Sequence, residues 1–159
     1  MSEATTDAAA ALGRVVSGVY VVTAGRNDAA TGMLASWVQQ CSFEPLQLSV
    51  AVQNGRPVLD LLADGEPFVV HVIPEGDKTL MKHFGKGFAP GEPAFEGLEV
   101  DRSATGVVRL SAALAYVECK ASGRFEAGDH TLVIGEAVVG GVLDDAAPMS
   151  HVRKTATHY

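Results

Sequence analysis

The sequence predicts a mainly β fold, an antiparallel β-barrel with a few short helices. Runs of β-branched and apolar residues recur along the chain and are separated by short turn segments. The helical patterns are short, and strands do not alternate with helices as they do in a parallel α/β sheet. With 159 residues, the chain is long enough to bury its own hydrophobic core, so we expect a single domain over residues 1–159.

The N-terminal part of the chain predicts a short helix and three strands. Residues 1–11 are expected to be loosely ordered, apart from an alanine-rich helical stretch that Asp7 can cap. The β-branched run 18–24 predicts a strand, and after a turn the chain returns from Thr31 as the second arm of a hairpin. The alternating segment 46–52 predicts the third strand.

The middle of the chain predicts two short helices on either side of a buried strand. Pro57 suits the first position of a helix, and the apolar residues after it give that helix one apolar face. The apolar run 68–73 predicts a strand that ends before Pro74. Residues 77–85 carry apolar residues at helical spacing, and residues 86–97 contain several Gly and Pro, so we expect a helix followed by a surface loop.

The last third of the chain predicts three strands and a tail. Strands are expected at 107–110, 112–121 and 131–139, with a bend at 123–128. The tail, residues 148–159, is basic and aromatic and could simply be frayed.

Composition excludes several classes of function. The chain has 12 basic and 19 acidic residues, a formal net charge of −7 and no basic run, which argues against nucleic acid and anionic membrane surfaces as partners. No apolar run reaches the ~18 residues of a membrane span, and the N-terminus lacks a signal-peptide pattern. Cys41 and Cys119 form no disulfide pattern, so we expect two small buried thiols and a reducing, cytoplasmic location.

Standard nucleotide, metal and nucleophile motifs are absent from the sequence. The glycines at 85–87 follow a predicted helix instead of a strand and lack the dinucleotide-loop spacing. The five histidines do not fall at metal-ligand spacing, so no metal site is expected. Nothing marks a turn that would present a catalytic nucleophile.

The segment 31–45 is the most informative part of the chain. Its small residues would let a flat ligand lie against the backbone, because no branched side chain holds the ligand away. A set of donors nearby could surround one anion, together with the helix start at Pro57: Ser36, Ser42, Asn54 and Arg56. The alternative is that the serines bond to the barrel backbone, Asn54 turns the chain and Arg56 is a solvated charge.

Four other side chains each allow two interpretations. Trp37 could stack on a ligand ring, although a lone tryptophan in an apolar strand is more often part of the core. His71 is expected to be a satisfied core histidine, and His83 to be a solvated residue of a helix. His130 lies in a predicted turn, where an exposed polar residue can contact a ligand.

Several segments, taken together and in order, match one family. They are 32–37 (GMLASW), 43–45 (FEP), 128–130 (GDH) and 132–138 (LVIGEAV). These segments resemble the flavin reductase-like family of FMN-binding split barrels. More narrowly, 80–84, 88–92, 114–119, 151–154 and 158–159 resemble the C-terminal flavin reductase-like domain of the flavodiiron proteins of oxygenic phototrophs. The resemblance covers roughly residues 12–159.

The resemblance implies an antiparallel FMN-binding split β-barrel that forms a homodimer, with FMN near the dimer interface. Residues expected at the flavin ring are Met33, Leu34, Ala35, Ser36 and Trp37, with Gln40, Cys41 and Ser42 beside it. Asn54 and Arg56 would lie at the phosphate, His83 and Phe84 would close the site, and the tail would cover the ring through His151, Arg153, His158 and Tyr159. His130 matches a histidine at the nicotinamide or flavin edge and is the candidate catalytic residue.

The activity implied is that of an NAD(P)H-dependent flavin reductase, which transfers hydride from NADH or NADPH to FMN. A monooxygenase or another acceptor of reduced flavin would be its partner. Two alternatives stay open: an FMN-dependent oxidoreductase acting on a small organic substrate, and a non-catalytic flavin-binding or electron-transfer module.

The sequence departs from the family at two positions, Cys41, where serine is common, and Leu46, where a second proline is common. No segment resembles the diiron or flavodoxin domains of flavodiiron proteins, so the diiron oxygen chemistry is not expected here.

Overall fold

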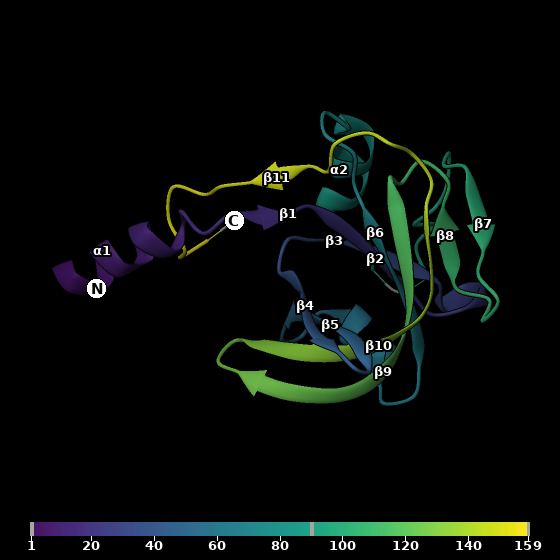
Figure 1. Cartoon of the computed structure of the whole chain (residues 1–159), viewed down its shortest axis with the longest axis horizontal. Coiled ribbons are helices and arrows are strands. Elements are labelled where there is room, and N and C mark those ends of the chain that lie inside the picture. The colour runs from purple at the N-terminus through teal and green to yellow at the C-terminus, as the bar shows by residue number, and fades with distance from the viewer. Residues whose placement is uncertain (1, 90, 159) are drawn as a thin grey trace.

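The computed structural model describes residues 2–89 and 91–158 and confirms the mainly β, antiparallel fold (Figure 1). Its main elements, in chain order, are α1 (Glu3–Leu12), β1 (Ser17–Gly18), β2 (Tyr20–Ala24), the 3₁₀ helix η1 (Asn27–Ala29), β3 (Thr31–Ala35), β4 (Val38–Phe43), β5 (Leu46–Gln53), the 3₁₀ helix η2 (Pro57–Leu62), β6 (Pro67–Val72), α2 (Lys78–Gly85), β7 (Val100–Arg102), β8 (Val108–Leu110), β9 (Ala115–Ala127), β10 (His130–Val142) and β11 (Ser150–His151). Among the described residues, no helix has the length and apolar character needed to cross a membrane.

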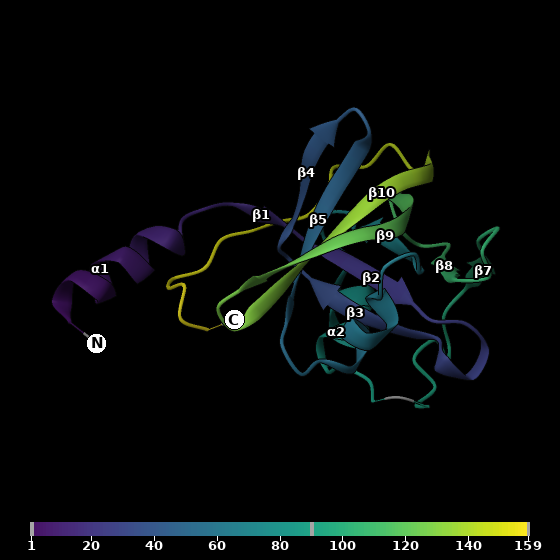
Figure 2. The ribbon, with the colours of Figure 1, turned by 90° about the horizontal axis from the view of Figure 1, so that it is seen from below.

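The main sheet has seven antiparallel strands in the order β3-β2-β6-β9-β10-β5-β4. β3 and β4 lie at opposite edges of this sheet, although only Ser36 and Trp37 separate them in the sequence. The sheet therefore curls until its edges approach each other (Figures 1 and 2). At the corner, the backbone amide of Ala51 in β5 donates a hydrogen bond to the carbonyl of Trp37 (3.0 Å).

The inside of the curled sheet is filled with apolar side chains. Val22, Val50, Val52, Phe68 and Val133 are fully buried and come from four strands, β2, β5, β6 and β10. Because side chains alternate across a strand, the neighbours of these residues point to the outer face of the sheet. The alternation therefore decides which residues of β5 and β10 can reach a ligand outside the core.

A second apolar cluster attaches α2 to the outer face of the sheet. Val21, Ile73, Leu80 and Phe84 are almost completely buried in it. The helix lies where the sequence predicts it, and Asp77 caps it, with its carboxylate accepting a hydrogen bond from the amide of Leu80 (2.9 Å). This packing places the C-terminal turn of α2 beside β3.

His71 is the satisfied core histidine that the sequence predicts. Its Nδ1 lies 3.0 Å from the carbonyl of Val21, and its Nε2 accepts a hydrogen bond from the amide of Leu110 (3.1 Å). The second bond requires an unprotonated Nε2, so the Nδ1 proton faces Val21. Burial lowers the pKa of His71 to about 4, and the positive charge of Arg109 adds to this effect, while the Val21 bond opposes it.

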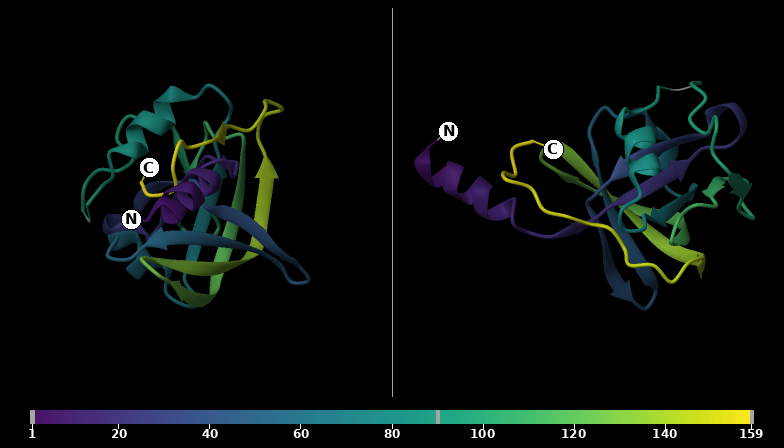
Figure 3. Two further views of the ribbon diagram at one scale, coloured as in Figure 1. Left: turned by 90° about the vertical axis from the view of Figure 1, so that its left-hand side faces the viewer. Right: turned by 90° about the horizontal axis from the view of Figure 1, so that it is seen from above.

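An arm made of α1 and residues 152–158 projects from one end of the molecule (Figures 1 and 3). α1 begins at Glu3 with Ser2 as its cap, so the predicted alanine-rich helix extends into the segment expected to be loose, and its cap is Ser2 instead of Asp7. The C-terminal part of the arm is bound to α1, because the amide of Arg153 donates to the carbonyl of Gly13 (2.9 Å). A second such bond joins the amide of Ala156 to the carbonyl of Ala9 (2.9 Å).

Other expectations about local structure need correction. β9 continues through Gly123 to Ala127, so the bend predicted at 123–128 is wrong, and β10 follows a turn at 128–129. The helix that begins at Pro57 is a 3₁₀ helix. Cys119 is buried, as expected, but Cys41 is exposed on β4.

Candidate functional site

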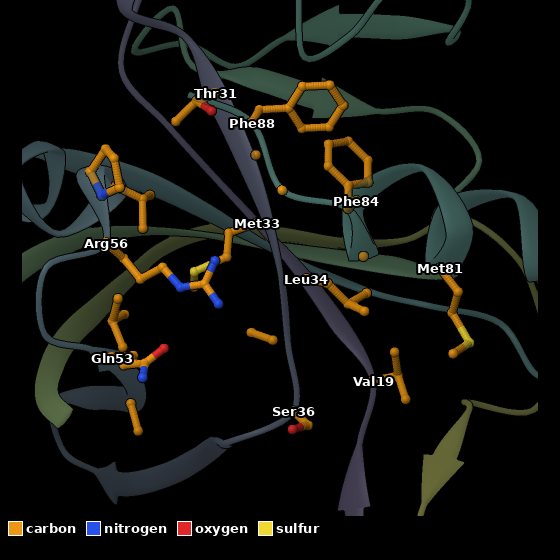
Figure 4. Close-up of a pocket in the computed structure, with 18 of the residues that line it drawn as sticks. Val19, Thr31, Met33, Leu34, Ser36, Gln53, Arg56, Met81, Phe84 and Phe88 are labelled. Carbon is orange, nitrogen blue, oxygen red and sulfur yellow. The ribbon is translucent and has the colours of Figure 1, made fainter. Parts of the chain in front are cut away.

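A cavity of about 370 Å³ lies at the corner where β3 approaches β5, and this volume is within the range of small-molecule sites (Figure 4). α2 and the loop after it close one side. The lining residues are Val19, Thr31, Gly32, Met33, Leu34, Ala35, Ser36, Ala51, Val52, Gln53, Arg56, Pro57, Val58, Met81, Phe84, Gly85, Gly87, Phe88 and His151.

The floor of the cavity is β3, an edge strand that pairs only with β2 in the sheet order. An edge strand presents backbone N–H and C=O groups that a ligand can use as hydrogen-bond partners. Gly32 lets α2 approach this strand, because a Cβ at this position would lie 2.5 Å from Cε1 of Phe84. The predicted platform residues Met33, Leu34, Ala35 and Ser36 all line the cavity.

The cavity has a polar side and an apolar side. In Figure 4, Arg56 and Gln53 lie on one side of the lining, and Phe84 and Met81 lie on the other. Among the lining residues that the structure describes, Arg56 alone carries a permanent charge. Gly87, with a φ of +74°, borders the guanidinium, since a Cβ there would lie 3.8 Å from its Nη1. The arrangement suits a flat apolar group that ends in an anion.

The predicted anion cradle is only partly assembled. Ser36 and Arg56 both line the cavity, but Ser42 lies on β4, outside the lining. Asn54 ties β5 to the β9–β10 turn: its Oδ1 accepts a hydrogen bond from Thr131 (2.7 Å), and its Nδ2 donates to the carbonyl of Gly128 (3.3 Å). The Asn54 side chain is thus used within the fold, in line with the alternative that Asn54 has a structural role at a turn of the chain.

Gln40 and Cys41 also lie outside the cavity lining. Both are exposed on β4, where the pairing with β5 is irregular between Gln40 and Ser42. The Gln40 amide donates to the carbonyl of Ser42 (3.4 Å). The structure thus separates these residues from the β3 platform because the chain turns at Ser36 and Trp37 toward the other edge of the sheet.

His83 and Phe84 are adjacent in α2 but have different surroundings. Phe84 is buried and lines the cavity. The Nε2 of His83 lies 2.7 Å from the carbonyl of Ala94, and its ring contacts Phe84 and Phe88. His83 therefore holds the loop after α2 in place, outside the lining itself.

His130 forms a cluster beside the cavity with Trp37 and Asp129. The sequence places His130 in an exposed turn, but it is the first residue of β10 and only 9% exposed. Its Nδ1 lies 2.7 Å from Oδ1 of Asp129, and this hydrogen bond lowers the pKa of the Asp129 carboxyl. The Trp37 ring contacts the imidazole, with ring centroids 4.8 Å apart. Trp37 belongs neither to the cavity lining nor to the buried core cluster.

The tail residues are distributed over three places. His151 lines the cavity, and the Arg153 guanidinium lies 5.0 Å from the Trp37 ring centroid. His158 is exposed on the arm and bonds to Thr157 through Nδ1 (3.1 Å). Tyr159 lies outside the described residues.

Sequence reasoning missed several lining residues. Gln53 is a polar residue that directly follows the predicted strand 46–52 and precedes Asn54, and this position could have indicated a site residue. Gly85 and Gly87 were considered only as a dinucleotide loop, whereas in the structure Gly87 borders Arg56 and Gly85 borders Leu34. Phe88 stood only in the segment 88–92 of the family resemblance, with no site role assigned, and Val19 carried no signal, because only the folded chain brings it to β3.

No three His, Cys, Asp or Glu side chains among residues 2–89 and 91–158 gather as metal ligands would.

The family model and the curated relatives that match this chain are all flavoproteins or flavin reductase-like domains. Residues 12–158 match the Flavin reductase like domain family. The chain is 38% identical over 151 residues to diflavin flavoprotein A 1 of Synechocystis sp., covering 94% of this chain and 26% of that protein. It thus spans about a quarter of the length of the curated relatives it matches.

Solved structures with the same fold include an NADH:FAD oxidoreductase and a flavin reductase. The NADH:FAD oxidoreductase SgcE6 of Streptomyces globisporus superposes with a TM-score of 0.83 at 25% identity, over 90% of this chain and 85% of that one. The styrene monooxygenase flavin reductase of Pseudomonas putida has a TM-score of 0.75 at 24% identity and covers 90% of each chain, a likeness of fold.

Proposed function

Because the chain belongs to the flavin reductase-like domain family, we propose that it is an oxidoreductase that reduces FMN with NADH or NADPH. The observation that carries the proposal is the cavity on β3, with apolar walls and a single guanidinium at its polar side. A bound flavin would supply the chemistry, because it accepts a hydride from a nicotinamide. The chain supplies binding, orientation and the exclusion of water.

Each part of the cavity has a role in this proposal. The β3 edge would donate and accept hydrogen bonds at the polar rim of the ring, and Phe84 and Met81 would keep water from its apolar part. Arg56 would pair with the phosphate. The proposal favours FMN over FAD because the cavity offers one cation for one phosphate group, whereas the neighbour SgcE6 is named for FAD.

The binding experiment compares FMN, FAD and riboflavin on the full chain by titration. We expect Arg56→Ala to weaken FMN binding about 10- to 100-fold, the loss of one charge-assisted hydrogen bond. Riboflavin, which has no phosphate, should lose less than about twofold. Arg102→Ala is the matched control, since Arg102 is exposed on β7 and outside the lining. Equal losses for FMN and riboflavin would remove the phosphate role of Arg56.

A homodimer is part of the proposal, supported by exposed apolar residues in two places. On and next to the arm, Leu12, Val15 and Val16 are 59%, 65% and 63% exposed. At the β4 edge, Phe43 is 88% exposed. Neighbouring exposed apolar residues such as Leu12, Val15 and Val16 are typical of interaction surfaces, and the arm projects away from the rest of the chain (Figure 1).

The partner in this proposal is an enzyme that accepts reduced flavin. The support is the name of one neighbour, which is the flavin reductase of a styrene monooxygenase. We also propose a cytoplasmic location, because Cys41 and Cys119 are both free thiols. Transfer of reduced flavin to a purified monooxygenase component, measured as product formed, tests the partner.

A further inference from the structure

β7 and β8 form a two-stranded sheet of their own, apart from the seven-stranded sheet. They lie at the end of the molecule away from the arm (Figure 1). Side chains of the main sheet hold β8 in place: the hydroxyl of Thr23 donates to the carbonyl of Val108 (2.6 Å), and Nε2 of His71 accepts from the amide of Leu110 (3.1 Å). Such an attachment can open locally while the ladder of the main sheet stays intact.

The bond from Leu110 exists in only one protonation state of His71. Nε2 can accept the amide proton only while it carries no proton of its own, since the Nδ1 proton already faces the carbonyl of Val21 (3.0 Å). A second proton on the ring would point at the Leu110 N–H, and two donors would then face each other. His71 is 0% exposed, so the charged ring is hydrated only if β8 moves away.

The charges around His71 do not favour a second proton. On β8, the positive charge of Arg109 lowers the pKa of His71, and Arg109 is itself paired with Asp101 of β7. On β9, Tyr116 stands opposite His71 and its ring lies 4.6 Å from the Arg109 guanidinium carbon, while Glu118 on the same face accepts a hydrogen bond from the β7–β8 turn (2.5 Å). The titratable side chains of α2 are Lys78 and Lys82, both exposed, and His83 at the Ala94 carbonyl.

Leu110 connects this bond to the cavity. It is buried in the same apolar cluster as Leu80 and Phe84 of α2. Phe84 and Met81 of α2 form the apolar side of the cavity (Figure 4). Because buried side chains are close-packed, withdrawal of Leu110 removes support from α2 and from this side of the cavity.

We propose that His71 is an acid-sensitive contact that releases β8 when its ring takes up a second proton, and that release of β8 weakens flavin binding in the cavity. In the neutral state, His71 holds the Leu110 amide and Leu110 supports α2. In the protonated state, β8 leaves the ring and Leu110 leaves the cluster. The second step rests on the proposed function, whereas the first step needs no ligand.

Amide hydrogen exchange of the full chain without ligand, followed by NMR, tests the release. A ring exposed by release has the ordinary pKa of 6.5, and the buried ring has a pKa of about 4, so release takes up nearly one proton between these values. The protection factor of the Leu110 amide, corrected for intrinsic exchange, should therefore fall about 20-fold from about pH 7 to about pH 5. The amide of Val133 in β10 reports on the main sheet and should stay better protected than Leu110 at both pH values.

Two variants separate the proton from the attachment. His71→Gln keeps a side-chain acceptor that does not titrate, so the fall in Leu110 protection should shrink to less than about twofold. Thr23→Val removes the other attachment, the bond to Val108, and leaves His71 unchanged. It should lower the protection of Leu110 at both pH values and retain the fall between them. Thermal unfolding checks that both variants are folded, and if His71→Gln is not, the unmodified chain and Thr23→Val carry the test.

Riboflavin tests the second step, because it has no phosphate group that titrates in this pH range. If the released form does not hold a flavin, riboflavin at about ten times its Kd should raise the protection factor of the Leu110 amide about tenfold. The same titration measures whether a flavin binds at all.

A Leu110 protection factor that is the same at both pH values, or that equals the one of Val133, would overturn the release. A full fall in His71→Gln would overturn the role of this ring. Riboflavin that binds without protecting Leu110 would overturn the link to the cavity while the proposed function stands. If riboflavin and FMN do not bind, the proposed function fails, and the exchange data without ligand decide the release by themselves.

Discussion

Replacing Gly32 by alanine tests how the cavity floor is built. A Cβ at this position would lie 2.5 Å from Cε1 of Phe84 and 3.1 Å from its Cδ1. Ordinary carbon–carbon contacts are about 3.5–4.0 Å, so the ring or the strand has to move by roughly 1 Å. Phe84 is 1% exposed and packs against Phe88 and Phe95, so the ring has little room to move.

Two effects of opposite sign decide the magnitude of this change. Overpacking of a buried site destabilises by about 1–3 kcal/mol. Removing a glycine from the unfolded chain stabilises by about 0.4–1 kcal/mol. The overpacking effect is the larger one, so we expect Gly32→Ala to lower the free energy of unfolding by about 1–2 kcal/mol and to weaken FMN binding at the displaced floor.

Urea unfolding followed by circular dichroism measures this prediction. The matched control is Gly123→Ala in β9, where a Cβ would meet nothing within 4 Å. That control should be unchanged or slightly stabilised. Adding Phe84→Leu to Gly32→Ala should give a double variant that costs less than the two single changes together, because the contact is shared. A Gly32→Ala protein as stable as Gly123→Ala would refute this account of the floor.

Three further predictions follow from other parts of the molecule. The pKa of His71 is lowered from 6.5 to about 4 in the folded protein, so between these pH values the unfolded chain binds one proton more than the folded chain. The free energy of unfolding should therefore fall by about 3 kcal/mol as the pH falls from 6.5 to 4. Urea unfolding at a series of pH values should show a weaker fall for His71→Gln. His130→Ala should lower kcat/KM for NADH by about tenfold, the value of one hydrogen bond, while the Kd for FMN stays the same; unchanged single-turnover reduction would contradict its role. Val16→Asp, which places a charge in the 63% exposed apolar surface near the arm, should convert a dimer to monomers in analytical ultracentrifugation, and a particle of unchanged mass would argue against this interface.

The local pattern of the sequence predicts those elements that depend on periodicity. The β-branched run 18–24 and the alternating run 46–52 become β2 and β5, and the helical spacing over 77–85 becomes α2. The pattern could not show that β3 and β4 separate to opposite edges, because that depends on pairing between distant strands. Gly123 lies inside β9 for the same reason, since pairing with β10 overrides its weak strand preference.

The residues of the candidate site also fall into those that a local pattern predicts and those that depend on contacts between distant segments. The small-residue platform and Arg56 could be selected from the sequence because their chemistry is local. The burial of His130 could not, because Trp37 covers it from another segment of the chain. Asn54 was an ambiguous residue, and only the positions of Thr131 and Gly128 show that its side chain is used within the fold.

The central claim is that this cavity binds a flavin that a nicotinamide can reduce. The most direct test is to load the full chain with FMN, exclude oxygen, add NADH or NADPH, and follow the flavin absorbance near 450 nm in a stopped-flow instrument. We predict rapid loss of the absorbance with at least one of the two donors. An absorbance that stays unchanged with both, in protein shown to bind FMN, would contradict the claim.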